Sequence, residues 1–496
     1  MNKPRVMVVG WDGATFDIIR PLAAEGRMPT LSRFMDQGAF GRLESTIPAV
    51  TPVAWTTMTT GCNPGKHGIF DGHQFDPQSG RMRFASASMR CVPPLWSLLA
   101  ARGLRPGVMN VPVTWPPDDL SGVNGVLVPG MFAPPGARDS IRPADFGRDF
   151  ERRFGPHADS PPRYDDPARY LASLLRGVDR RREMIEFLMD RGPFDFLFAV
   201  FMETDRVQHF FWKYRDPAHP RHAELGDAVE RVYEALDTAL AALMDKAGPD
   251  ATFALASDHG AGPLHTGVFL NRWLMDNGLL ALKSPMETLL RPAAPSTLGR
   301  LARKAAARLG LTDKARAADD LNNRFRSAID WDATLAWSDG MGGSVYFNPG
   351  KADDRLRDEL TFAVHSGLTD LRGPDGKPVI EAVHRREDVY AGPQTPDAPD
   401  LIVECAPGCQ VYAPHEFLLH GAGDPAALFV RHPWSGRHEK YGVFALHGPG
   451  VRPGADFGEC AMADVAPTLL ALMGCPVPAH MDGRTVAAAL DFVPPA

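Results

Sequence analysis

The stretch RVMVVGWDG at residues 5–13 is an apolar run that ends in an aspartate, Asp12, and a glycine. Short runs that are apolar at nearly every position are typical of parallel strands buried on both faces of a sheet. A helical pattern at residues 223–248, closed by Gly248, is typical of a helix that covers such a sheet. The sequence therefore predicts an α/β fold with a doubly wound, mostly parallel sheet flanked by helices. Three further runs of the same form are RPGVMNVP (105–112), FDFLFAVFMETD (194–205) and ATFALASDHG (251–260).

The composition excludes several classes of protein. The 496 residues are 44% apolar and 23% charged, which argues against a disordered or fibrous chain. A net charge of −7 gives no overall attraction to a nucleic-acid polymer. The apolar runs are shorter than a transmembrane segment or the core of a signal peptide, and the six cysteines are too scattered for a disulfide scaffold. We therefore expect a cytoplasmic protein that acts on a small molecule.

Two segments interrupt the α/β pattern. Residues 283–316 carry eight basic and two acidic residues, which indicates either the solvated face of a helical hairpin or a surface for an anionic substrate or lipid. Residues 351–437 mix a helix, a turn and short strands. The predicted division is a catalytic core over 1–282, a basic helical cap over 283–330, a return to the core over 331–350, a second insertion over 351–437 and the rest of the core over 438–496.

Carboxylate and imidazole side chains follow the predicted strands at the point where each strand ends. Ligands of open α/β sheets bind outside the carboxyl ends of the strands. Three carboxylates and three imidazoles gathered there would repel one another without cations, and two divalent ions divide them naturally. Mixed oxygen and nitrogen ligands suit Zn²⁺ best and Mn²⁺ next. The six side chains are Asp12, Asp205, His209, Asp258, His259 and His438, with His447 as a rival to the last.

A hydroxyl nucleophile is indicated by the segment TIPAVTPVAWTTMTTG. An extended, proline-marked approach followed by a helical run places Thr51 at or near a helix N-terminus, where free amides stabilise negative charge. Coordination to a dication would make its alkoxide accessible near neutral pH. The alternative role of Thr51 is a helix N-cap. The four threonines at 56, 57, 59 and 60 are rival nucleophiles.

Taken together, these residues and several longer motifs resemble the alkaline phosphatase superfamily, most closely its type I phosphodiesterase and nucleotide pyrophosphatase branch. The motifs are TTGCNPGKHGIFDG, DRVQHFFW, SDHG, APDLIV and DVAPTLLALMGCPVPAHMDGR. The last four of these resemble bacterial members known only as predicted phosphohydrolases or phosphomutases. The resemblance extends over most of the chain.

The resemblance implies a metal-dependent hydrolase of phosphoric esters with two metal ions. One ion would be held by Asp205, His209 and His438, and the other by Asp12, Asp258 and His259. Thr51 would bridge toward the second ion and attack phosphorus, forming a phospho-threonine enzyme. The side chains that contact the substrate are less clearly indicated, and the candidates are Arg206, Lys66, Asn110 and Trp55.

Three alternatives remain open at the level of sequence. A phosphomutase would use the same metals but return the phosphoryl group to its substrate. A sulfatase or phosphonate hydrolase is the second alternative. The motif CNPGK resembles the cysteine signature of sulfatases, but its cysteine, Cys62, follows the Thr-Gly pair instead of preceding it. A catalytically silent metal-binding protein is the alternative outside enzymology.

Overall fold

The computed structural model describes residues 5–76, 81–134, 140–157, 159, 164–283, 322–340, 342–412, 428–431 and 434–494. The chain divides into two compact units. Unit 1 consists of Met1–Gly68, Ser86–Pro263 and Trp434–Ala496. Unit 2 consists of Ile69–Ala85 and Leu264–Pro433.

Unit 1 is built on an eight-stranded sheet with the order β19-β2-β18-β8-β1-β7-β5-β6. The four runs that predict buried parallel strands form β8, β1, β7 and β5, which are neighbours and mutually parallel. β18 is antiparallel to both of its neighbours. The predicted α/β fold with a mostly parallel sheet is confirmed. The strands are β1 (Val6–Trp11), β2 (Ala39–Glu44), β5 (Pro106–Met109), β6 (Val126–Val128), β7 (Phe196–Phe201), β8 (Thr252–Ala256), β18 (Tyr441–His447) and β19 (Ala455–Ala461).

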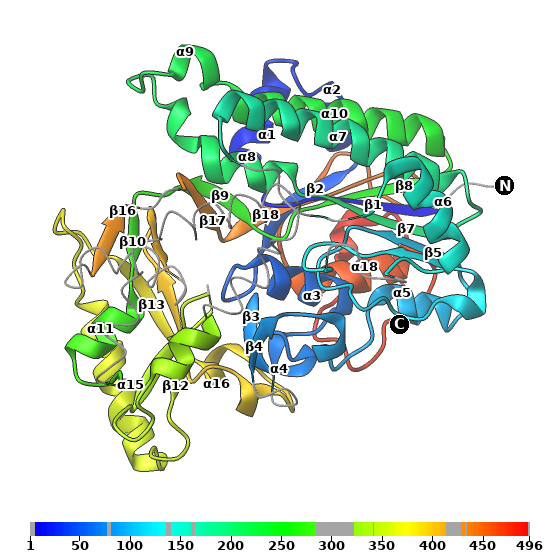
Figure 1. Cartoon of the computed structure of the whole chain (residues 1–496). Coiled ribbons are helices and arrows are strands. Elements are labelled where there is room, and N and C mark those ends of the chain that lie inside the picture. Colours follow the sequence, from blue (N-terminus) through cyan, green and yellow to red (C-terminus); the bar gives the residue numbers. More distant parts are fainter. Residues whose placement is uncertain are drawn as a thin grey trace. The chain divides into compact units, whose positions relative to one another are not determined.

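Helices cover both faces of this sheet (Figure 1). Successive side chains of β1 point to opposite faces, so that Met7 and Val9 enter one apolar cluster while Val6 and Val8 enter the other. The first cluster is covered by α1 (Phe16–Ala24), α2 (Pro29–Gln37), α6 (Ala144–Phe154), α7 (Pro167–Met189), α8 (Glu203–Phe211) and α10 (Ala228–Ala247). The second is covered by α3 (Thr51–Thr60), α5 (Leu95–Ala100) and α18 (Val465–Leu472).

The helix predicted at residues 223–248 is present as α9 (His222–Leu225) followed by α10. Its C-terminus is the predicted one, since Gly248 adopts a φ of 81° and its amide donates to the carbonyl of Met244. Two short elements complete the part of unit 1 that carries the site. They are α4 (Pro64–His67) and the antiparallel pair β9 (Gly260–Pro263) and β17 (Gly436–Glu439).

Unit 2 has its own sheets and its own apolar core. Residues 331–350, which we expected to return to the core, instead form β11 and β12 of a four-stranded sheet in unit 2. The reason is that Val345 and Phe347 pack into the same apolar cluster as Val364 and Leu401. The strands and helices of unit 2 whose full bounds lie within the described residues include β3 (His73–Asp76), β4 (Arg81–Phe84), β10 (Thr266–Val268), α11 (Leu270–Asp276), β11 (Ala336–Asp339), β12 (Ser344–Phe347), α15 (Asp354–Thr369), β13 (Ile380–Arg385), α16 (Arg386–Val389), β14 (Leu401–Cys405), β15 (Cys409–Val411) and β16 (Phe429–Arg431).

Most of the predicted basic cap, residues 284–321, lies outside the described residues. Within the described parts of the chain, no helix is both long and apolar enough to cross a membrane.

Candidate metal centre

The candidate ligands gather at the edge of the unit 1 sheet where the parallel strands end. Asp12 follows β1, and the pair Asp258 and His259 follows β8. β7 leads into α8, whose first turns carry Asp205 and His209 four residues apart on one helical face. β1 lies between β7 and β8 and is parallel to both, so these three carboxyl ends meet at one edge.

His438 reaches the same place by an antiparallel strand. On β17 it pairs with Ala261 of β9, the strand that begins directly after His259. The rings of His438 and His259 stack, with their centroids 3.6 Å apart and an interplanar angle of 17°. His447, the rival candidate, lies at the far end of β18, where its ring packs on Phe34.

Asp205, His209 and His438 form one group that is able to hold a metal ion. Oδ1 of Asp205 lies 3.0 Å from Nε2 of His209 and 3.3 Å from Nε2 of His438. The other ring nitrogen of each histidine faces a backbone carbonyl, at 2.8 Å from Gly436 O and 2.9 Å from Ala49 O. A carbonyl only accepts, so both Nδ1 atoms carry a hydrogen, and in the neutral ring the lone pair is then on Nε2.

Those two lone pairs face each other across 3.2 Å, the distance between Nε2 of His209 and Nε2 of His438. Two acceptors at this separation repel unless a cation or a proton lies between them. Donation from Nδ1 to a carbonyl is also the usual arrangement behind a metal-bound histidine. The donor set of this group therefore fits a divalent cation.

Asp12, Asp205 and His259 form the second group, so that Asp205 belongs to both. Nε2 of His259 lies 3.6 Å from Oδ1 of Asp12 and 3.3 Å from Oδ2 of Asp258. Nδ1 of His259 donates to the carbonyl of Gly260 at 2.9 Å, which again leaves Nε2 as an acceptor. Asp258 borders this group through His259.

Two buried oxygens in or beside the second group have no hydrogen-bond partner among the described residues: Oδ1 of Asp12 and Oδ2 of Asp258. Both aspartates and His259 are fully buried. Buried carboxylate oxygens without a partner carry a large desolvation cost, which a bound cation removes. This second donor set therefore fits a cation as well.

The electrostatics of the cluster point the same way. Burial, followed by the charges of Asp258 and Asp205, raises the pKa of Asp12 well above its usual range. Burial also raises the pKa of Asp258, against the opposing hydrogen bond from the Gly13 amide. Asp205 differs, because its histidine neighbours overcome the effect of burial and hold its pKa well below the ordinary value. A cation would keep all three carboxylates ionised together.

Thr51 is the first residue of α3, and Val50 occupies the N-cap position. The Thr51 hydroxyl therefore does not cap the helix; it lies 3.3 Å from Nε2 of His259. The rival hydroxyls inside α3 are engaged elsewhere. Those of Thr56, Thr59 and Thr60 donate to carbonyls one turn earlier, and that of Thr57 pairs with Nε2 of His67.

Two of the predicted substrate contacts have other roles. Trp55 is fully buried, and its indole Nε1 donates to Oδ2 of Asp12 at 2.8 Å, so it has no surface to offer a substrate. Lys66 binds the C-terminal loop, where its Nζ donates to Oδ1 of Asp482 at 2.6 Å and to the carbonyl of His480 at 2.8 Å. Cys62 is buried beside this loop, and burial raises the pKa of its thiol to about 11, which does not suit a reactive sulfatase residue.

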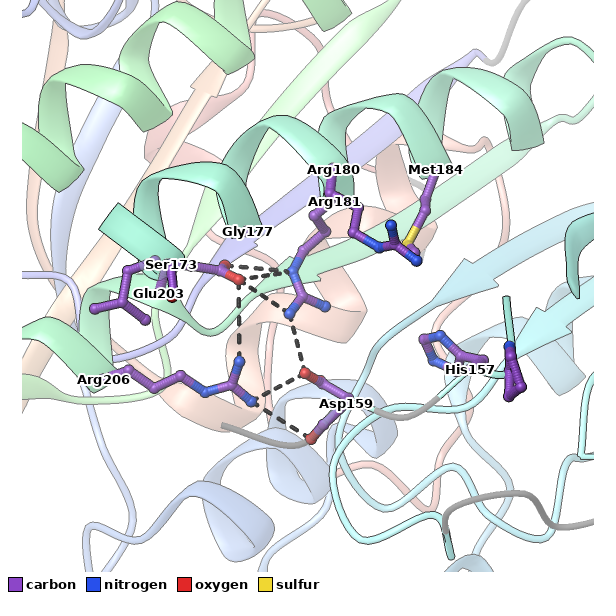
Figure 2. A pocket seen from close by; sticks show the side chains of 11 residues that line it. His157, Asp159, Ser173, Gly177, Arg180, Arg181, Met184, Glu203 and Arg206 are labelled. Carbon is purple, nitrogen blue, oxygen red and sulfur yellow. Dashed lines mark hydrogen bonds and ion pairs between the residues drawn. The ribbon is translucent and has the colours of Figure 1, made fainter. Parts of the chain in front are cut away.

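Arg206 is held by a buried charge network (Figure 2). Its Nη2 donates to Oδ1 of Asp159 at 3.0 Å. Nη2 of Arg181 lies 3.0 Å from the same oxygen of Asp159 and 3.1 Å from Oε1 of Glu203. These four side chains line a pocket of about 150 Å³ together with parts of α7. The guanidinium of Arg206 is thus engaged in this network through its Nη2.

Asn110 lies at the end of β5 and remains a candidate. It is fully buried with a φ of 59°, and neither side-chain polar atom has a hydrogen-bond partner within the described residues. A buried amide in this state calls for a water or a ligand group.

Three supporting contacts escaped the sequence analysis because they join distant residues. The amide of Gly13 donates to Oδ1 of Asp258 at 3.2 Å, and Nε2 of Gln208 donates to the carbonyl of Gly13 at 2.8 Å. The ring of Trp434 packs on that of His209 with centroids 4.4 Å apart. Only the first had a local signal, a glycine directly after the strand-end aspartate. Gly13 has a φ of 70°, and a Cβ there would lie 3.2 Å from Cε1 of His259.

Comparison with solved structures gives the same fold. Human ectonucleotide pyrophosphatase/phosphodiesterase 5 is 14% identical, with 98% of this chain and 100% of that chain covered and a TM-score of 0.54. The murine protein, in an inactive threonine-to-alanine form in complex with AMP, is also 14% identical, with 96% and 97% covered and a TM-score of 0.52. Phosphonoacetate hydrolase from Sinorhizobium meliloti 1021 in complex with phosphonoformate is 16% identical, with 93% and 94% covered and a TM-score of 0.54.

No curated protein sequence matches the chain. The family profile of the type I phosphodiesterases and nucleotide pyrophosphatases matches residues 6–422, which include every candidate ligand except His438. With this match across most of the sequence and the shared fold, the chain belongs to the type I phosphodiesterase/nucleotide pyrophosphatase family of the alkaline phosphatase superfamily and is a phosphoester hydrolase.

Proposed function

We propose that this protein hydrolyses a small-molecule phosphodiester through Thr51 as nucleophile. The observation that carries the proposal is the position of the Thr51 hydroxyl, 3.3 Å from Nε2 of His259 and beside two groups of metal-type ligands that meet at Asp205. A structural threonine at a helix start normally caps the helix, and this one does not.

The described side chains fit two divalent ions, and Zn²⁺ or Mn²⁺ suits their mixture of oxygen and nitrogen atoms. Asp205, His209 and His438 would hold one ion, and Asp12, Asp258 and His259 the other, with Asp205 placed to contact the second ion as well. When bound, such a pair neutralises charge on the phosphoryl group and favours the ionised hydroxyl of the nucleophile.

The chain's own groups then perform the substitution. Thr51 Oγ1 attacks phosphorus, the bond from phosphorus to the leaving oxygen breaks, and the phosphoryl group is carried on Thr51. Water releases it in a second displacement. The first turn of α3 stabilises the negative charge, because its positive dipole end points at the position of Thr51.

The murine structure supports the role of a threonine, because its threonine-to-alanine form is inactive and holds AMP. A nucleotide is therefore one phosphoester class to test on this protein.

The test is a substrate panel with metal-stripped enzyme reloaded with Zn²⁺ or Mn²⁺. The panel contains bis-p-nitrophenyl phosphate, p-nitrophenyl phosphate, a phenylphosphonate ester, p-nitrophenyl sulfate and AMP-containing diesters. We expect the diesters to be turned over best and the sulfate not at all. Turnover of the sulfate ester alone contradicts phosphoryl transfer. Isomerisation of a sugar phosphate with retention of ³²P and no free phosphate identifies a mutase instead.

Thr51→Ala tests the nucleophile on the same panel, with Thr56→Ala as the matched control from the same helix. We expect a loss of about 10³-fold or more in kcat for Thr51→Ala, in the range seen when a covalent nucleophile is removed. Thr56→Ala loses only a hydroxyl that donates to Pro52 O, so its kcat stays near that of the unmodified enzyme. Acid-quenched enzyme carries a phosphoryl group on the Thr51 peptide, detected by mass spectrometry. Comparable diester turnover by Thr51→Ala removes Thr51 from this role.

A further inference from the structure

Trp55 connects the helix of the nucleophile to a candidate metal ligand. It lies four residues after Thr51 in α3, so the two side chains emerge from the same side of the helix one turn apart. Its indole Nε1 donates to Oδ2 of Asp12 at 2.8 Å, and both residues are fully buried.

The strand beneath Trp55 is shaped to admit the indole. Gly10 lies on β1, and Asp12 follows the strand two residues later. Both residues meet the indole of Trp55, Gly10 through its backbone and Asp12 through its carboxylate. A Cβ on Gly10 would lie 2.5 Å from Cη2 of Trp55, closer than atoms can approach. The absence of a side chain at Gly10 therefore lets the indole ring of Trp55 approach β1 closely enough for its nitrogen to reach Asp12.

The hydrogen bond sets the orientation of the Asp12 carboxylate. An indole N–H only donates, so it engages one oxygen, Oδ2, and leaves Oδ1 free of partners among the described residues. Oδ1 is the atom that faces Nε2 of His259 at 3.6 Å. Without the indole, the Asp12 carboxylate loses its one side-chain donor among the described residues. Nothing then determines which of its two oxygens faces His259.

The ring is fixed by its surroundings as well. Trp55 packs edge-to-face on Phe198 of β7, with ring centroids 5.9 Å apart and an interplanar angle of 66°. A buried aromatic ring in such contacts has little rotational freedom. The donor position is therefore defined before any ion binds, which lowers the ordering cost of the site.

We propose that Trp55, admitted by Gly10, is a positioning residue that orients Asp12 for cation binding and fixes the Thr51 helix to β1. The inference rests on the proposed function and adds a residue that acts through Asp12 without touching the substrate. Partners of this kind behind metal ligands typically contribute about 10- to 100-fold to metal affinity.

Trp55→Phe is the main test, because it removes the N–H and keeps most of the ring. The chain offers a matched control: Trp96 is equally buried, and its Nε1 donates to Oδ2 of Asp118 at 2.8 Å. Metal-stripped full-length protein is titrated with Mn²⁺, and the dissociation constant is read from the rise in melting temperature. We expect Kd to rise about 10- to 100-fold in Trp55→Phe and to stay unchanged in Trp96→Phe.

The kinetic readout separates positioning from general destabilisation. At low Mn²⁺ we expect kcat of Trp55→Phe to fall with KM nearly unchanged, and excess Mn²⁺ to restore much of it. A merely structural role lowers the melting temperature of the metal-free protein but leaves the Mn²⁺ dissociation constant as it was. Gly10→Ala provides a second variant in case Trp55→Phe fails to fold, because its Cβ displaces the ring while the N–H remains. It is expected to weaken Mn²⁺ binding in the same direction.

The outcomes distinguish this inference from the proposed function. Tight Mn²⁺ binding by the unmodified protein with an unchanged Kd in Trp55→Phe, or in Gly10→Ala if only that variant folds, overturns the role of Trp55 and leaves the metal site intact. Failure of the unmodified protein to bind Mn²⁺ or Zn²⁺ overturns the metal site itself, and the positioning role falls with it.

Discussion

Asp205 is the residue on which both candidate metal groups depend. It belongs to the group with His209 and His438 and also to the group with Asp12 and His259. Its position on the first turns of α8 explains this, because the side chain extends from the end of β7, next to the end of β1. A single substitution there removes a ligand from two places at once.

We therefore expect Asp205→Asn to lose most of both bound ions, whereas Asp12→Asn loses one and keeps the other. The physical reason is that an amide keeps the shape of the carboxylate but lacks its charge. Metal per chain, measured by inductively coupled plasma mass spectrometry after dialysis, distinguishes the two variants. Asp216→Asn, on an exposed turn, serves as the control. Equal metal contents in Asp205→Asn and Asp12→Asn contradict the shared role of Asp205.

His67 makes the stability of the protein depend on pH. It is fully buried with its Nε2 at 2.9 Å from the Thr57 hydroxyl, and burial, followed by the charge of Arg90, lowers its pKa to about 3. The unfolded chain protonates the same residue near pH 6.5. His67 therefore favours the folded state fully above pH 6.5, and this contribution is lost as the pH falls from 6.5 toward 3.

At pH 5 the loss from His67 is about 2 kcal/mol, from a difference of about 1.5 pH units at 1.36 kcal/mol each. We expect the free energy of unfolding of His67→Gln to fall less between pH 7 and pH 5 than that of the unmodified protein, by about that amount. Urea unfolding followed by tryptophan fluorescence measures it. His365→Gln, at an exposed position on α15, is the control. An identical pH dependence in His67→Gln rules out the effect.

The helix α8 contributes side chains to two different networks. Asp205 and His209 face the metal groups, while Glu203 and Arg206 enter the buried network with Asp159 and Arg181 of Figure 2. Since α8 begins directly after β7, this network fixes the turn that sets the direction of Asp205.

We expect Arg181→Met to destabilise unit 1 by about 3–5 kcal/mol, because it leaves the buried carboxylates of Glu203 and Asp159 with too few cationic partners. Urea unfolding at pH 7 measures the change. Arg176→Met is the matched control on the same helix, where an exposed arginine is expected to contribute within about 0.5 kcal/mol. A loss below 1 kcal/mol in Arg181→Met contradicts a structural role for the network.

The whole molecule shows which features the sequence predicts and which it does not. β1, β5, β7 and β8 were predictable because both of their faces are buried, so nearly every position is apolar. β19 was not, because most of its side chains are partly or largely exposed. Residues 331–350 were misplaced, since a short buried strand carries no information about which of two cores it will join.

The candidate site divides in the same way. Ligands at strand ends were predictable, because parallel strands bring their carboxyl ends together wherever they lie in the sequence. Their supports were not. Trp55 reaches Asp12 across 43 positions and Arg206 reaches Asp159 across 47, and no local pattern marks either partner. Burial also determines these roles, and burial follows from packing of the whole unit.

Metal removal is expected to act on one unit of the molecule. Both candidate metal groups lie in unit 1, on segments separated by more than 400 residues from Asp12 to His438. An ion that binds only the folded state stabilises it by about 2.7 kcal/mol at 100 times its Kd. Bound ions also offset the burial, and the repulsion between carboxylates, that raise the pKa of Asp12 and Asp258. Chelation therefore loosens the strand ends that the ions would join.

Amide hydrogen exchange followed by mass spectrometry tests this on the full chain with and without Mn²⁺. We expect exchange to slow on metal addition in peptides that contain the ends of β1 and β8 and in β17, because local opening there would break metal bonds. Peptides from β13 and α15 of unit 2 provide the internal control and keep their rates. Protection spread equally over both units would show that the ions bind elsewhere. Protection that is confined to unit 1 and is lost in Asp205→Asn would locate the ions at the carboxylate of Asp205. A general effect of Mn²⁺ on the protein or the solvent would not depend on that one side chain.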